Sequence, residues 1–234
     1  MSILNVEHLS HGFGDRAIFE DVSFRLLKGE HIGLVGANGE GKSTFMNIVA
    51  DVLDKTSGDI LYNEKNVKEM KADYRKLIGY LPQNVGLYPG FTARETLEYF
   101  GYLRGGKKED MEEGIDRALS ATNLLKYKDN KISSFSGGMK RRMAIAITLI
   151  GDPEILIFDE PTTGLDPQER VRFRELLLKV RENKTVIIST HIVSDIDKLA
   201  DHVLIIKEGK VVHRIEGKHD DLEGIYMKFF EGEE

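Results

Sequence analysis

The chain has 234 residues, of which 41% are hydrophobic and 31% are charged, a composition typical of globular proteins. Its formal net charge of −6 gives no general attraction for nucleic acid, so no nucleic-acid partner is expected. The absence of cysteine excludes disulfides and cysteine-ligated zinc, and because the apolar runs are short we expect neither a signal peptide nor a membrane span.

The first part of the chain predicts strands with one helix among them. Loose alternation of apolar residues at 17–26 and the apolar run HIGLVG at 31–36 each predict a strand. Residues 42–52 are predicted to form a helix. Two more strands are predicted from DILYN at 59–63 and KLIGYLPQ at 76–83.

The middle of the chain predicts three helices in succession. The first begins at Thr92, where Glu95 completes the pattern of a capping box. The second begins at Asp110 and the third covers about 138–150. Apolar residues recur at helical spacing in the last two, namely Met111, Ile115, Ala118 and Leu119, then Met139, Met143, Ala146, Ile147 and Ile150.

The last part of the chain returns to alternating strands and helices. EILIFDE at 154–160 and KTVIIST at 184–190 predict buried strands. Between them, Asp166 caps a predicted helix with an apolar stripe of Phe173, Leu176, Leu177 and Val180. A hairpin is predicted to turn at Glu208 and Gly209. The final residues, 219–234, predict a short amphipathic helix with Leu222, Ile225, Tyr226 and Phe229 on one face.

This order of elements predicts an α/β fold with a mostly parallel sheet covered on both faces. We expect one domain over 1–234, with 1–83 and 151–234 forming the α/β core. The helices of 84–150 interrupt the alternation and are predicted to form an inserted helical lobe.

A glycine-rich turn between a strand and a helix predicts a phosphate-binding loop. GANGEGKS fits the pattern G-x-x-x-x-G-K-[ST] with the required flanks, so an ordinary turn is the weaker interpretation. Bare backbone would let N–H groups surround a di- or triphosphate, and the following helix adds its positive dipole end. Lys42 would reach the β- and γ-phosphates, and the Ser43 hydroxyl would ligate Mg²⁺. The nucleotide-contacting residues are then Gly36, Asn38, Gly39, Gly41, Lys42, Ser43 and Thr44.

Phosphoryl transfer also requires a group that holds Mg²⁺ and a group that acts on the attacking water. At the end of the strand ILIFDE, Asp159 suits the magnesium shell and Glu160 suits the base or polariser of water. His191 follows another predicted strand and suits contact with the γ-phosphate or that water. Alone, the carboxylates could be ordinary surface charge and His191 a structural histidine. The phosphate loop on the same sheet favours the catalytic interpretation.

A second stretch, FSGGMKRRMAIA at 135–146, also places glycines before a helix. The N–H groups of Ser136, Gly137 and Gly138 would offer another anion site. The cations at 140–142 lie in the first turn, where each opposes the helix dipole by about 0.3–1 kcal/mol. They suggest a docked anion, or pairing with carboxylates elsewhere, unless they form only a solvated cationic face.

One nucleotide does not need two cradles that lie far apart in one chain. Two chains facing head to tail would resolve this, because residues 136–138 of one would cap the γ-phosphate held at 36–44 of the other. The sequence therefore predicts a dimer that buries two nucleotides.

Together these motifs resemble the ATP-binding subunit of an ABC transporter over nearly the whole chain. The matching features are the loop at 36–44, Gln83 in LPQ, FSGGM at 135–139, ILIFDE, GLD at 164–166 and His191. The resemblance implies a P-loop ATPase cassette with an antiparallel β part, which binds ATP and Mg²⁺ and hydrolyses ATP. FSGGM departs from the family's usual LSGGQ at Phe135 and Met139 but keeps the serine and both glycines.

The resemblance also assigns roles that spacing alone does not. It implies that Gln83 senses magnesium and water and that Asp166 communicates across the dimer. Phe13 resembles the aromatic residue that stacks on adenine, although a core phenylalanine is nearly as good an interpretation. The catalytic set implied is Glu160, His191, Gln83 and Lys42, and the metal set is Ser43, Gln83 and Asp159.

The partners implied are a separate transmembrane permease and a second ATPase subunit, identical or similar. The segment after Gln83 is similar to that of drug- and peptide-export subunits, where Leu87, Tyr88, Pro89 and Phe91 either receive the permease or form the lobe's own core. This implies a cytoplasmic protein at the inner face of the cell membrane. Two alternatives stay open: an ABC-F-like ribosome factor, which residues 1–50 resemble, and a DNA-repair ATPase, which the absence of sustained heptads disfavours.

Overall fold

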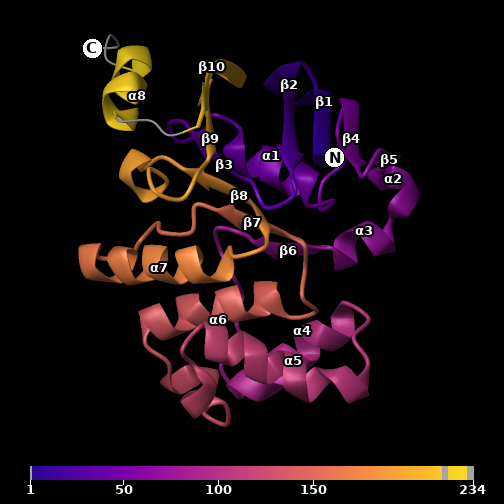
Figure 1. Ribbon diagram of the computed structural model, residues 1–234, viewed down its shortest axis with the longest axis vertical. Coiled ribbons are helices and arrows are strands. Elements are labelled where there is room, and N and C mark those ends of the chain that lie inside the picture. Colours follow the sequence, from indigo (N-terminus) through magenta and orange to yellow (C-terminus); the bar gives the residue numbers. More distant parts are fainter. Residues whose placement is uncertain (1, 218–220, 231–234) are drawn as a thin grey trace.

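A computed structural model describes residues 2–217 and 221–230, which form two β-sheets and a group of helices (Figure 1). The smaller sheet is antiparallel and has the order β2-β1-β4-β5. Its strands are β1 (Ser2–Phe13), β2 (Arg16–Leu27), β4 (Ser57–Tyr62) and β5 (Lys65–Asn66). The antiparallel part that the family resemblance implies is therefore confirmed.

The larger sheet determines where the functional loops lie. Its order is β10-β9-β3-β8-β7-β6, and every neighbouring pair is parallel except β10 with β9. The strands are β3 (His31–Val35), β6 (Ile78–Leu81), β7 (Ile155–Asp159), β8 (Thr185–Thr190), β9 (His202–Lys207) and β10 (Lys210–Glu216). The carboxyl ends of β3, β8, β7 and β6 consequently meet at one edge, where loops of a parallel sheet form binding sites.

Both faces of this sheet are buried, as the all-apolar strands predict. On one face α1 (Lys42–Val49) lies between the two sheets, where Phe45 packs against Phe19 and Phe24 of β2. On the other face α7 (Pro167–Val180) buries its predicted stripe of Phe173, Leu176, Leu177 and Val180 against alternate residues of β7, β8 and β9. The sheet therefore holds α1 and α7 on opposite sides of the same loop edge.

Three helices, α4 (Ala93–Leu103), α5 (Lys108–Ala121) and α6 (Gly137–Leu149), surround a hydrophobic cluster of their own (Figure 1). The capping box at Thr92 and Glu95 is present, and the apolar stripe predicted for α5 is buried. Arg104 donates to the carbonyl oxygens of Thr148 and Ile150, which joins the end of α4 to the end of α6. Burial lowers the pKa of Arg104 to about 10. Because α6 also contributes Ala144 and Ile145 to the core under β7, it belongs to both packing units.

The remaining elements are short, apart from a helix near the end of the chain. They are α2 (Val67–Met70), α3 (Ala72–Lys76) and the 3₁₀ turns η1 (Leu125–Tyr127), η2 (Ile132–Ser134) and η3 (Val193–Asp195). The predicted terminal helix is present as α8 (Leu222–Phe230) and packs on the core through Leu222, Ile225, Tyr226 and Phe229. Its predicted flanks at 219–220 and 231–234 lie outside the described residues. In the described ranges, no helix has the length and apolarity needed to span a bilayer.

The contact between β6 and α6 depends on a residue without a side chain. A Cβ built at Gly79 would lie 2.3 Å from the Thr148 carbonyl oxygen, closer than atoms in contact can approach. We expect Gly79→Ala to push α6 away from the sheet and lower the free energy of unfolding by about 1–3 kcal/mol. Urea denaturation followed by circular dichroism measures this.

Gly86→Ala is the matched control, because a Cβ at Gly86 has no neighbour within 4 Å. Equal unfolding free energies for the two variants would show that the β6–α6 contact is looser than described.

Candidate functional site

The phosphate loop connects the end of β3 to α1, as its flanks predict. Gly39 and Gly41 have φ values of 92° and 83°, in the left-handed region where side chains are disfavoured. A Cβ on Gly36 would lie 2.4 Å from the Ile206 carbonyl oxygen, so the loop also needs glycine for close packing. Among the described residues, the N–H groups of Lys42, Ser43 and Thr44 have no protein acceptor. They are the free donors of a helix N-terminus, the arrangement that binds phosphate.

Lys42 lies inside this loop rather than in solvent. Its side chain is 4% exposed, and its Nζ donates to the carbonyl oxygens of Gly36 and Ala37, each at 2.8 Å. The same nitrogen lies 3.3 Å from Oε1 of Glu160, which is also 4% exposed. The positive charge is therefore buried at the loop centre, where a phosphate oxygen could replace its present carboxylate partner.

Ser43 and Asp159 come together from the loop and the neighbouring strand. The Ser43 hydroxyl donates to Asp159 Oδ1 at 3.0 Å, and the Ser189 hydroxyl donates to the same oxygen at 2.6 Å. A hydroxyl beside a carboxylate fits Mg²⁺, which prefers oxygen ligands and keeps several waters and phosphate oxygens. Within the described residues no three acidic or histidine side chains form a metal cluster, so a bound Mg²⁺ would rely on such additional ligands.

Glu160 occupies a constrained backbone position at the same edge. Its φ is 46°, uncommon for a residue other than glycine, and such conformations cost about 1–3 kcal/mol. The main-chain N–H donates to the Ser189 carbonyl and hydroxyl oxygens at 3.2 and 3.0 Å. Hydrogen bonds therefore hold this backbone in place and direct the side chain towards Lys42.

The carboxylate of Glu160 contacts a different partner through each oxygen. Oε2 lies 2.7 Å from Nδ1 of His191 and accepts a hydrogen bond from the Thr163 hydroxyl at 3.1 Å. Oε1 has the ion pair with Lys42 but no hydrogen-bond donor aligned with it. That buried oxygen is therefore available to accept a proton from water, the role of a general base.

Other predicted residues lie around this centre without joining it. Gln83 follows β6 and is exposed, and Asp166 caps α7 by accepting the Glu169 N–H at 2.9 Å. Phe13 is 58% exposed at the end of β1, with its ring against His11 at 4.7 Å between centroids, so it is not a core residue. Among the described residues, no hydrogen bond or ion pair joins Ser136, Gly137 or Gly138 to the phosphate loop.

The tip of α6 is a second set of free donors. Ser136 is the N-cap, and its hydroxyl accepts the Met139 N–H at 3.2 Å. The N–H groups of Gly137 and Gly138 have no acceptor in the described part of the chain. Unpaired amides thus lie at two helix N-termini that carry glycines, at 36–41 before α1 and at 137–138 in the first turn of α6.

Sequence reasoning missed three groups that support the site. Ser189 contacts both Asp159 and Glu160, and the buried Thr162 hydroxyl donates to the buried Asp195 carboxylate. Arg141 donates to main-chain carbonyls next to the site. A polar pair at a strand end signals Ser189, but the partners of Asp195 and Arg141 depend on tertiary packing.

Comparison with known proteins identifies the family. The model of the family described as ABC transporter matches residues 19–163, which is more than half of the chain. This chain belongs to the ABC transporter ATP-binding family.

Relatives of this ABC transporter ATP-binding subunit cover most of its length. An uncharacterized ABC transporter ATP-binding protein of Methanocaldococcus jannaschii is 36% identical over 220 residues, covering 94% of this chain and 79% of the relative. The Nod factor export ATP-binding protein I of Bradyrhizobium diazoefficiens is 37% identical, over 90% of this chain and 68% of the relative.

A solved structure extends the likeness to the fold. CbiO1 from Clostridium perfringens, part of the ABC transporter complex CbiONQ, matches with a TM-score of 0.83 and 29% identity. The match covers 99% of this chain and 91% of CbiO1. The α/β ABC ATPase cassette predicted from the sequence is thereby confirmed. As a member of the family, this ABC subunit binds ATP and hydrolyses it to power transport.

The position of Lys42 leads to a test of nucleotide binding. We expect Lys42→Ala to weaken ATP binding by about 2–3 kcal/mol, or roughly 30- to 150-fold, because a charge-assisted hydrogen bond to phosphate is lost. Titration with a fluorescent ATP analogue measures the dissociation constant.

Lys65→Ala removes an exposed lysine of β5, at the edge of the smaller sheet, and serves as the control. An unchanged dissociation constant for Lys42→Ala would place the triphosphate elsewhere.

Proposed function

We propose that the chain is the motor of a transporter in which ATP closes two ATPase subunits and hydrolysis reopens them. The observation that carries this is the pair of unpaired helix N-termini in one chain, one with buried Lys42 and one at Ser136. A single triphosphate bound at Lys42 leaves the amides of Gly137 and Gly138 without a phosphate. A second copy, placed head to tail, would supply that phosphate. The two-fold interface would then hold two nucleotides, each between the phosphate loop of one copy and the α6 tip of the other.

The geometry supports a role for each residue of this site. The loop amides and Lys42 would hold the β- and γ-phosphates, while Ser43 and Asp159 would hold Mg²⁺ with phosphate and water. Exposed Phe13 would stack on adenine, and Gln83 would approach the metal from the end of β6. Asp166 would face the partner copy near Ser136.

Glu160 would act on the water that attacks the γ-phosphate. Its Oε1 would take a proton from water as the water oxygen bonds to phosphorus, while the bond to the β-phosphate oxygen breaks and leaves ADP and phosphate. His191, 2.7 Å from Oε2, would orient the carboxylate and contact the γ-phosphate. Bound Mg²⁺ would neutralise the charge that develops on the phosphate oxygens.

We also propose a separate membrane permease as the partner and export as the direction. The relative named for Nod factor export supports the direction, and CbiO1, named as part of a complex, supports a multi-subunit transporter. Tyr88, Phe91 and Tyr99 form an exposed aromatic cluster on residues 84–150, with ring centroids 5.2–6.2 Å apart. Exposed aromatic surface of this kind suits a partner helix.

This arrangement places the protein on the cytoplasmic side, peripheral to the membrane. Residues 84–150 would move as a helical lobe relative to the core of 1–83 and 151–234. Their separate hydrophobic cluster supports that division.

The test is whether ATP holds two copies together when hydrolysis is blocked. Glu160→Gln keeps the side-chain shape but removes the base, so we expect a dimer with two trapped ATP molecules at saturating Mg-ATP. Light scattering measures the mass, and ATP hydrolysis should fall by at least 100-fold.

Glu182→Gln, at an exposed position after α7, is the control and should hydrolyse ATP normally. A monomeric Glu160→Gln protein at saturating Mg-ATP would contradict the proposed closing. Co-sedimentation with ribosomes and stimulation of hydrolysis by them would favour the ABC-F-like alternative instead.

A further inference from the structure

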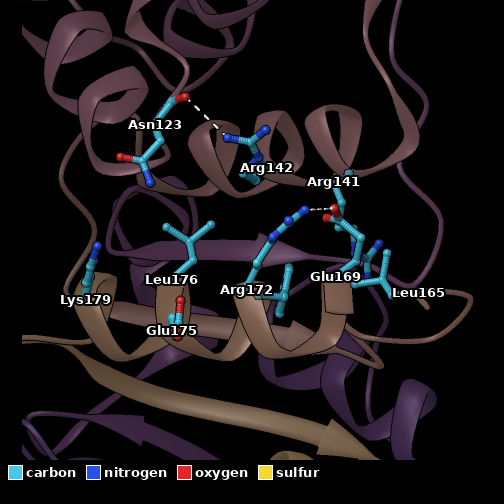
Figure 2. A pocket seen from close by; sticks show the side chains of 11 residues that line it. Asn123, Arg141, Arg142, Leu165, Glu169, Arg172, Glu175, Leu176 and Lys179 are labelled. Carbon is cyan, nitrogen blue, oxygen red and sulfur yellow. Dashed lines mark hydrogen bonds and ion pairs between the residues drawn. The ribbon is translucent and has the colours of Figure 1, made fainter. Parts of the chain in front are cut away.

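Two arginines in the second turn of α6, Arg141 and Arg142, donate to main-chain carbonyl oxygens. Arg142 donates to the main-chain carbonyl oxygens of Thr122 and Asn123, the latter at 3.3 Å (Figure 2). Arg141 lies on the other side of the same turn and makes a different set of contacts. Among the described residues neither arginine has an ion pair with a carboxylate, so pairing with carboxylates elsewhere, one of the interpretations that the sequence left open, does not hold for these two.

The Arg141 guanidinium joins three carbonyl oxygens from two catalytic loops. Nε donates to Pro161 at 2.7 Å, Nη2 to Glu160 at 3.1 Å and Nη1 to Gln83 at 3.2 Å. The guanidinium also lies over the ring of Phe173 in α7, 5.9 Å from its centroid. One side chain of the helix tip thus contacts the segments after β6 and β7 and the helix that follows Asp166.

These contacts act on a constrained part of the backbone. Glu160 has a φ of 46°, and its N–H is held by Ser189 on one side of the residue. Arg141 holds the carbonyl group on the other side and the next carbonyl at Pro161. A planar fork of donors can satisfy all three carbonyls at once, whereas the single nitrogen of lysine cannot reach them in the same geometry.

We propose that Arg141 is a positioning residue for hydrolysis, which ties the main chain of Glu160 and Gln83 to the helix tip at Ser136. Movement of that tip is passed to the hydrolytic carboxylate of the same chain. When Ser136 of one copy receives the phosphate bound by its partner, Arg141 sets Glu160 in the first copy. The inference deepens the proposed function and rests on it for this last step.

Arg142 provides the matched control. It is the next residue of the same helix and has the same charge, but its carbonyl partners lie between α5 and η1, away from Glu160. Replacing either arginine by glutamine removes one charge and the donors of both part-buried and exposed main-chain carbonyls. A purely structural role therefore predicts similar effects of the two substitutions on stability and on activity.

The experiment measures kcat, KM for ATP and thermal unfolding for Arg141→Gln, Arg141→Lys and Arg142→Gln. We expect Arg141→Gln to lower kcat at least tenfold with KM changed less than twofold, because Lys42 and its loop are untouched. Arg141→Lys should recover part of the lost kcat, and Arg142→Gln should stay within twofold of the unsubstituted protein. The Arg141→Lys measurement decides the matter if Arg141→Gln fails to fold, since a kcat equal to that of the unsubstituted protein overturns the proposal.

Equal kcat values for Arg141→Gln and Arg142→Gln would overturn the proposal, as would a loss of activity explained by KM alone. The double variant with Arg141→Gln and Glu160→Gln tests ATP-driven dimer formation independently of kcat. It therefore distinguishes failure of the Arg141 proposal from failure of the motor model. Dimers at saturating Mg-ATP without any kcat effect of Arg141 would reject the role of Arg141 only.

Discussion

The site depends on a buried ion pair at the edge of a parallel sheet. Lys42 and Glu160 face each other at 3.3 Å with only 4% of each residue exposed. Burying an isolated charge costs several kcal/mol, so each group stabilises the other where it lies. In the proposed cycle, a nucleotide that enters the loop would bring phosphate oxygens to Lys42 and release the Glu160 carboxylate towards water. The same pair would therefore couple nucleotide binding to the freeing of the proposed base.

The strand order brings these two residues together. β3 carries the phosphate loop, β8 lies beside it, and β7 follows β8. Ser189 in β8 thus lies between Lys42 and Glu160 along the sheet and hydrogen-bonds to both Asp159 and Glu160. On the other side of β7, strand β6 ends just before Gln83. Arg141 donates hydrogen bonds to the main-chain carbonyls of both Gln83 and Glu160 and so connects the two segments. The sheet sets the spacing, and α6 adds a contact from outside the sheet.

Much of this arrangement could be predicted from the sequence because its motifs carry local geometry. The glycines of the loop, the capping box at Thr92 and the Asp166 cap each specify their own backbone conformation, and the structure contains all three. β1 could not be found this way, because bulges near Leu4 and Leu9 break its alternation and His8 has a φ of 50°. β5 has two residues, and α2 and α3 are too short to show a period. The contacts of Arg141 also escape sequence reasoning, because a long side chain takes its direction from neighbours distant in the sequence.

The most direct measurement is a structure of the protein with a non-hydrolysable ATP analogue and Mg²⁺. If a nucleotide is shared between two copies, its γ-phosphate will lie beside Lys42 of one copy and at the amides of Gly137 and Gly138 of the other. Density for the triphosphate away from Lys42, or a Ser136 region that faces no phosphate in any assembly, would contradict it.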